Sequence, residues 1–308
     1  MRILLATDGS AHASVAEALL QSVKPWREAT IVVAAVAVPP TPLMASFMPT
    51  AETAYAAQYA ELWTVLRTEA QKHLDAAAQR LRAKGMNVET RLLEGDVAAC
   101  LAECAEKEQC SLIAVGSRGQ GGFASFLLGS VARNLVNGSK TSVLVARHDE
   151  HATPEATAER IAQLERLSVL VGIDGSDGSK AAVSHLVGYG PETFGDMYAL
   201  CALPLSPLPI GIEPELVTEL VDLDRKHGEE VAREIGTNLQ HCCDKVTCET
   251  IAGRSAEVLI EEARRKKVDL VAVGATRHGT LERLLIGSVA YEVATSAPCS
   301  VLVIRPAA

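Results

Sequence analysis

Short runs of β-branched and aliphatic residues alternate along the chain with longer stretches in which apolar residues recur every three or four positions. Strand and helix patterns in strict alternation are typical of a parallel sheet with right-handed crossovers. In the first half the pattern predicts strands at Arg2–Thr7, Thr30–Val38, Asn87–Leu93, Leu112–Gly116 and Ser142–Ala146. In the second half it predicts strands at Ser168–Ile173, Asp196–Leu203, Lys245–Ile251, Leu270–Gly274 and Val301–Arg305.

Helices are predicted between these strands. They cover Ala11–Val23, Ala51–Lys84, Val97–Gln109, Ser130–Asn137 and, in the second half, Pro214–Cys242. Doubly wound sheets of five strands commonly follow the order 3-2-1-4-5, with a crevice where strands 1 and 4 end. We therefore predict an α/β protein with two tandem domains, each a five-stranded parallel doubly wound sheet in the order 3-2-1-4-5.

One glycine motif occurs twice in the chain. The stretch Gly116–Gly119, followed by Gly129-Ser130, is nearly repeated by Gly274–Arg277, followed by Gly287-Ser288. The flanking strands match as well, and both opening strands end in Asp-Gly-Ser. Self-similarity of this length indicates an internal duplication.

The duplication sets the expected domain boundaries. The chain has 308 residues, about twice a typical domain. We expect one domain at residues 1–147, a linker at 148–167 and a second domain at 168–308. Within the linker, Ile161, Leu164 and Leu167 are spaced so that one helical face can dock on a domain.

The glycine loop has the chemistry of a phosphate site. A glycine at position 116 lets a ligand approach the end of a buried strand, and Gly119, Gly121 and Gly122 permit left-handed backbone conformations. Gly129-Ser130 then starts a helix, whose free N–H groups and positive dipole end suit a phosphate, as does the Ser130 hydroxyl. The alternative is a plain strand-to-helix turn, and the recurrence of the motif favours a binding site.

Two other phosphate-binding motifs do not fit. A Walker A loop ends in Gly-Lys-Ser/Thr, whereas Gly129-Ser130 is followed by Val131. The stretch Gly119–Ala124 fits a dinucleotide pattern only superficially, because it follows the fourth strand and not the first.

The glycine motif after a Leu-Ile-Ala-Val strand, the opening Asp-Gly-Ser and the final Val-Leu-Val strand resemble the universal stress protein family, here as a tandem two-domain member. The resemblance covers nearly the whole chain except the linker and the loops after the second strand of each half. It implies Rossmann-like, adenine-nucleotide-binding domains and an ATP-binding regulatory role in the stress response, with Mg²⁺ on the phosphates. Hydrolysis of ATP, and a module for dimerisation or interaction that binds no nucleotide, are the alternatives.

The resemblance also implies site residues. Ala6, Thr7, Asp8 and Val36 are expected around the base and ribose. The ribose and phosphates are expected along Gly116, Arg118, Gly119, Gly129 and Ser130. The alternative role for Asp8, and for Asp174 in the second half, is to cap or turn the start of the following helix, and both roles can coexist.

The second copy of the motif has changed. It keeps Gly274, Gly287 and Ser288, with Asp174 after its first strand, but Arg277 replaces the second glycine. The guanidinium can fill the phosphate space or contact phosphate itself. We expect the first domain to hold most of the nucleotide, and second-site binding stays open.

Composition excludes several classes of partner. The net charge is −9, without a Lys/Arg cluster, which argues against nucleic acid. The chain has no apolar run near the roughly 20 residues that span a bilayer, and no secretory signal pattern at its start. We expect a cytoplasmic protein. Its eight cysteines lack paired zinc spacing, and we interpret them as ordinary thiols, with a metal or redox role as the alternative.

The last strands of both halves are expected at sheet edges, and exposed edges usually find a partner. In tandem members of the resembled family the two domains pair through such strands. We therefore expect Val143–Ala146 to pair with Val301–Ile304. We also expect a homodimer, and a protein partner that the sequence does not identify.

Overall fold

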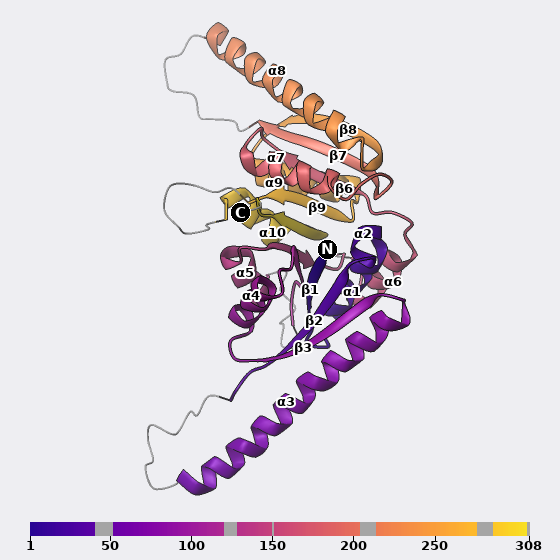
Figure 1. Ribbon diagram of the computed structural model, residues 1–308. Coiled ribbons are helices and arrows are strands. Elements are labelled where there is room, and N and C mark those ends of the chain that lie inside the picture. The colour runs from indigo at the N-terminus through magenta and orange to yellow at the C-terminus, as the bar shows by residue number, and fades with distance from the viewer. Residues whose placement is uncertain (41–51, 120–127, 150, 204–213, 276–285, 307–308) are drawn as a thin grey trace.

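The computed structural model describes residues 1–40, 52–119, 128–149, 151–203, 214–275 and 286–306 (Figure 1). The first half contains β1 (Arg2–Ala6), α1 (Ala11–Ser22), α2 (Lys24–Arg27), β2 (Thr30–Ala37), α3 (Glu52–Ala83), β3 (Asn87–Glu94), α4 (Val97–Lys107), β4 (Leu112–Gly116), α5 (Ser130–Gly138) and β5 (Ser142–Ala146). After α6 (Pro154–Gln163), the second half contains β6 (Val169–Ile173), α7 (Asp177–Val187), β7 (Phe194–Leu203), α8 (Pro214–Leu239), β8 (Cys243–Ala252), α9 (Ser255–Lys266), β9 (Leu270–Gly274), α10 (Ser288–Ser296) and β10 (Ser300–Ile304).

All the described strands belong to a single sheet in the order β3-β2-β1-β4-β5-β10-β9-β6-β7-β8. Within each half this is the predicted order 3-2-1-4-5. The structure differs from two separate sheets because β5 and β10 pair antiparallel, with Leu144 opposite Leu302. The predicted pairing of the two halves through their last strands is confirmed.

Helices cover both faces of the sheet, so its central strands are apolar on both sides (Figure 1). Successive residues of a strand point to opposite faces. Ile3 and Leu5 of β1 therefore belong to a core with α1 and α3, whereas Leu4 belongs to a second core with α4 and α5. Both cores continue without interruption into the second half, which makes the two halves one packed body.

Polar side chains start several of these helices. Ser10 accepts a hydrogen bond from the amide of Ala13 at the start of α1, and Ser176 accepts one from Ser179 at the start of α7. Asp96 caps α4 in the same way. These caps satisfy amides that have no partner within the helix, and they place the turns that follow β1 and β6.

The linker helix α6 packs against α1, as its apolar spacing predicts. Ile161 and Leu167 are buried and Leu164 is partly buried. On the other side of α6, Arg160 forms an ion pair of 2.6 Å with Asp269, the residue before β9. The linker thus contacts both halves. None of the described helices combines the length and apolar character that a membrane span requires.

Candidate functional site in the first half

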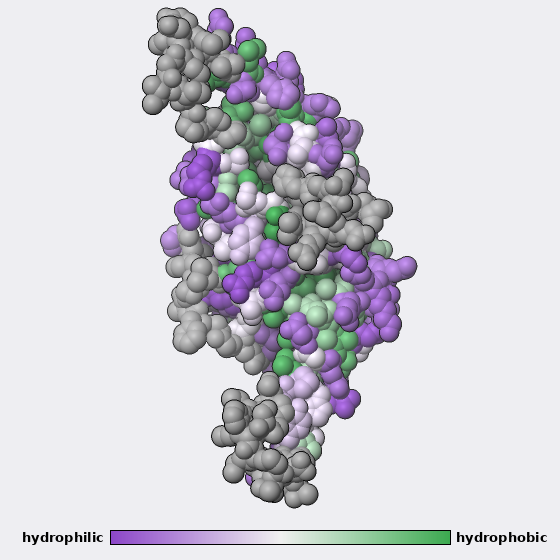
Figure 2. Space-filling model, turned by 90° about the vertical axis from the view of Figure 1, so that its left-hand side faces the viewer, coloured by the Kyte–Doolittle hydropathy of each residue, from purple (hydrophilic) through white to green (hydrophobic). Residues whose placement is uncertain are grey.

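A cavity of about 610 Å³ opens at the carboxyl ends of β1, β2 and β4, beside the N-terminus of α5. Figure 2 shows the side of the molecule that lies at the left of Figure 1, toward which these strands run. On the lower half of this face, apolar residues form a patch between hydrophilic ones. The cavity is lined by Ala6, Thr7, Asp8, Ala13, Ala34, Val36, Val38, Val97, Leu101, Val115, Gly116, Arg118, Gly119, Leu128, Gly129, Ser130, Val131 and Ala132.

Every first-half residue predicted for the site lines this cavity, apart from Gly121 and Gly122, which lie outside the described residues. The residues come from separate elements. Thr7 and Asp8 follow β1, Arg118 and Gly119 follow β4, and Ser130 begins α5. The topology brings them together because β1 and β4 are neighbours in the sheet and their carboxyl ends share one edge.

Asp8 is positioned by the turn into α1. One oxygen of its carboxylate accepts a hydrogen bond of 3.0 Å from the amide of Ser10. Asp174 accepts the matching bond from Ser176 in the second half. The turn role expected for both aspartates is therefore present, while the capping role belongs to the serines. The other oxygen of Asp8 lies over Gly119, where a Cβ would stand 2.6 Å from it.

The glycines of the loop have structural roles that the sequence does not show. A Cβ on Gly116 would lie 2.9 Å from the main-chain carbon of His12, so this glycine is needed for the packing of α1 on β4, and it also lines the cavity. Gly119 has no left-handed φ. Its small size instead leaves room for the Asp8 carboxylate.

The N-terminus of α5 faces the cavity. Gly129 is the N-cap residue and supplies no side-chain cap, and its amide donates to the carbonyl of Ser117 at 2.8 Å. The exposed Ser130 and the following first-turn residues line the cavity. First-turn amides have no acceptor within their helix, so this end carries partial positive charge, and Arg118 lines the same cavity.

Sequence reasoning missed the apolar side of the cavity. Ala34 lies on the same face of β2 as the predicted Val36, because strand residues alternate between faces, and Val38 follows directly after the strand. Val97 and Leu101 are one turn apart on α4. These spacings are visible in the sequence, but no local pattern says that β2 and α4 meet at the cavity.

Two histidines, His12 and His148, lie near Arg118 of the glycine loop. The rings of His12 and His148 make an edge contact with centroids 5.1 Å apart. Burial lowers the pKa of both, and the pKa of each is lowered further by nearby positive charge, including Arg118. Both lowered pKa values favour the neutral imidazole near pH 7, so among the described residues that line the cavity the positive charge comes from Arg118.

The second half has a smaller cavity in the matching place, of about 310 Å³. The predicted Asp174, Gly274, Gly287 and Ser288 line it, and Arg277 lies outside the described residues. A Cβ on Gly274 would stand 2.0 Å from the Gly178 carbonyl oxygen, so this glycine also serves helix packing, here of α7 on β9.

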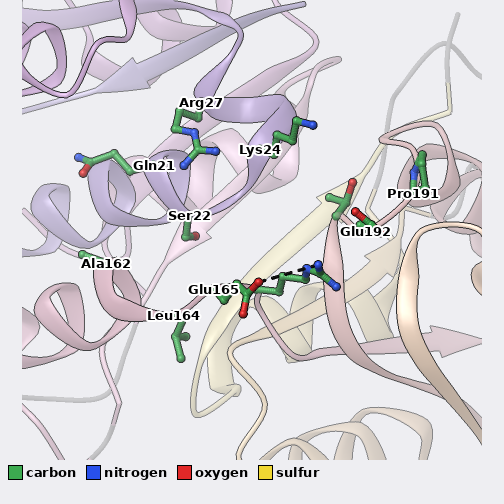
Figure 3. A pocket seen from close by; sticks show the side chains of 11 residues that line it. Gln21, Ser22, Lys24, Arg27, Ala162, Leu164, Glu165, Pro191 and Glu192 are labelled. Carbon is green, nitrogen blue, oxygen red and sulfur yellow. Dashed lines mark ion pairs between the residues drawn. The ribbon is translucent and has the colours of Figure 1, made fainter.

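A third cavity, of about 390 Å³, lies between the halves, and none of the predicted site residues lines it (Figure 3). Lys24 and Arg27 reach it from α2, and Glu192 from the turn before β7. Glu165 of the linker faces Arg166, its ion-pair partner. Among the described residues there is no group of three or more histidine, cysteine or acidic side chains arranged to hold a metal ion.

Fold and cavities together define a tandem α/β protein, in which each half of a shared sheet carries a ligand-sized hollow at the carboxyl ends of its strands. The chain belongs to the universal stress protein family, whose family model matches residues 1–147 and again residues 166–305.

Individual relatives agree with this assignment. A universal stress protein of Mycolicibacterium smegmatis is 30% identical over 223 residues, which cover 72% of this chain and 70% of that protein. Universal stress protein MJ0531 of Methanocaldococcus jannaschii is 33% identical over 138 residues, or 44% of this chain and 81% of that protein. The crystal structure of a universal stress protein from Archaeoglobus fulgidus, 20% identical, covers 99% of this chain and 96% of its own with a TM-score of 0.61, a likeness of fold.

Proposed function

We propose that this chain is an ATP-binding regulatory protein of the stress response, whose first half holds the nucleotide and whose bound state alters contacts with a protein partner or a second copy. The observation that carries the proposal is the convergence of Ala6–Asp8, Val36, Arg118-Gly119 and Gly129-Ser130 on the 610 Å³ cavity. The family resemblance implies these residues, which are far apart in the chain.

The two ends of the cavity suit the two ends of a nucleotide. Val36, Val38 and Leu101 provide an apolar region for a flat base. Arg118 and the N-terminus of α5 provide charge and free amides for phosphates. Asp8 is the acidic residue of the described lining. Its carboxylate can accept hydrogen bonds from the ribose hydroxyls, because the ribose joins the base to the phosphates.

Magnesium fits the site as a companion of the phosphates. Mg²⁺ usually keeps several waters and is held by one or two carboxylates together with substrate phosphates. Asp8 is the carboxylate of the described lining that can take part, because its side chain lies over the glycine loop. When bound, the ion would neutralise phosphate charge beside Asp8.

Isothermal titration of the full chain with ATP and Mg²⁺ tests the proposal. We expect saturable binding that is abolished by Gly119→Val, because a side chain at Gly119 must displace the Asp8 carboxylate and enter the cavity. Gly138→Ala is the matched control, since a Cβ there would meet nothing within 4 Å. Unaltered affinity in Gly119→Val would refute this site, and mass spectrometry of gently purified protein gives an independent test through co-purified ATP.

A further inference from the structure

Two buried arginines cross from one half of the chain to the other in matching positions. Arg147 follows β5 and Arg305 follows β10, and each side chain is only 6% exposed. The amide of Arg147 donates to the hydroxyl of Ser300 at 3.1 Å, and the amide of Arg305 donates to the hydroxyl of Ser142 at 3.0 Å. The antiparallel pairing of β5 and β10 therefore places each arginine beside the first residue of the strand that its own strand pairs with, Ser300 of β10 or Ser142 of β5.

Each guanidinium then reaches the last turn of a helix in the opposite half. Arg305 donates from Nη2 to the carbonyl oxygen of Val136 in α5 at 2.6 Å. Arg147 donates from Nη2 to the carbonyl oxygens of Ala294 and Thr295 in α10, both at 2.9 Å. Carbonyl oxygens of a last helical turn receive no hydrogen bond from an N–H group of their own helix, and they form its negative end. An arginine there therefore makes a favourable hydrogen bond and charge interaction.

These two helices are the ones whose N-termini line the cavities. Ser130 at the start of α5 lines the first-half cavity, and Ser288 at the start of α10 lines the second-half cavity. Each helix spans nine residues, and helices this short depend on tertiary contacts for their stability and position. At its N-terminal end α5 is tied by the hydrogen bond from Gly129 to Ser117, and at its C-terminal end by Arg305.

We propose that Arg305 and Arg147 form a reciprocal clasp, in which each half of the chain positions the cavity-facing helix of the other half. Arg305 is thus a positioning residue for the first-half site, although it belongs to the second half. The consequence for ligand binding rests on the proposed nucleotide function, whereas the clasp itself concerns the two helices. The full affinity of a nucleotide site in one half therefore depends on a residue of the other half.

Titrations of the full chain with ATP and Mg²⁺ test the effect on the site. We expect Arg305→Met to raise the Kd for ATP by about 5-fold, which is the upper end of the effect that a cation ordinarily has at a helix C-terminus. Arg305→Lys, which keeps the charge and a donor, should recover most of the affinity. Arg160→Met is the matched control: it removes an arginine that bonds the buried Asp269, away from α5, and should lower stability while leaving the Kd unchanged.

Hydrogen exchange without nucleotide tests the clasp by itself. We expect Arg305→Met to speed amide exchange in the last turn of α5 but not of α10, and Arg147→Met to do the reverse. Equal loss of ATP affinity in Arg305→Met and Arg160→Met, or exchange that rises equally in both helices, would overturn the clasp. If the unaltered protein binds no ATP while the reciprocal exchange pattern is found, the proposed function fails and the clasp stands.

Discussion

Replacement of Gly116 or Gly274 by alanine is expected to destabilise the protein rather than to block a ligand directly. At Gly116, a Cβ would lie 2.9 Å from the main-chain carbon of His12 and 3.1 Å from the amide nitrogen of Ala13. At Gly274, it would lie 2.0 Å from the main-chain oxygen of Gly178. These neighbours are backbone atoms of α1 and α7, so they yield only if a whole helix moves away from the sheet.

Overpacking of this kind typically costs about 1–3 kcal/mol. We expect Gly116→Ala in the lower part of that range and Gly274→Ala at or above its upper end, because its contact is closer by 0.9 Å (2.9 against 2.0 Å) and falls on a carbonyl. In folded units of 150–250 residues, each kcal/mol shifts the Tm by about 2–4 °C. Gly138→Ala should leave the Tm unchanged or raise it slightly, since a Cβ there meets nothing and alanine is the better helix former.

Thermal scans of the three variants without ligand, followed by ATP titrations well below each Tm, provide the measurement. The expected order of Tm is Gly138→Ala, then Gly116→Ala, then Gly274→Ala. The reasoning is refuted if Gly116→Ala keeps the Tm of the unaltered protein and loses ATP affinity. That result would show that the absence of a Cβ at position 116 makes room for the ligand and not for α1.

Three other predictions follow from burial and strand pairing. The folded state lowers the pKa of His12 and His148, so the unfolded chain binds protons first; the Tm should fall as the pH drops through about 6.5, and His148→Gln should flatten that fall in scans from pH 7.5 to 5.5. Ile161→Ala should lower the free energy of unfolding by about 2–5 kcal/mol, measured with denaturant, because the side chain is 1% exposed between α6 and the core. Residues 1–147 alone should self-associate in light scattering, because every residue of β5 is buried in the full chain and the isolated half exposes the edge of β5 that pairs with β10, while the pairing with β4 remains.

The sequence was sufficient for most of the fold because its signals are local. Runs of β-branched and aliphatic residues located every strand, and the common order of five-stranded doubly wound sheets predicted the strand order within each half. Element ends that depend on distant partners were less accurate. β7 begins at Phe194 and not at Asp196, since Phe194 pairs with Cys243 across the sheet. The four-residue helix α2 has no periodicity to detect, although Pro25 favours a helix start there.

The candidate site shows the same division. Residues of the glycine motif and of the Asp-Gly-Ser turn could be assigned to one crevice from topology, since β1 and β4 are adjacent in this strand order. The reason for Gly116 could not be predicted, because the atoms that exclude a side chain belong to α1, about a hundred residues earlier in the chain. Val97 and Leu101 were missed for the same reason, as only the packing of α4 brings them to the cavity.

Comparison of the two halves separates the requirements of the fold from those of the ligand. Features present in both halves mostly have a structural role: Gly116 and Gly274 admit a helix, Asp8 and Asp174 form a turn, and the two arginines cross to the opposite half. Positions that differ lie against the cavities, where Ala6 and Thr7 are replaced by Gly172 and Ile173. The repeated motif is therefore retained by packing whether or not both halves bind a ligand. Recurrence alone cannot count as support for a second nucleotide site, and the smaller cavity of the second half favours binding in the first.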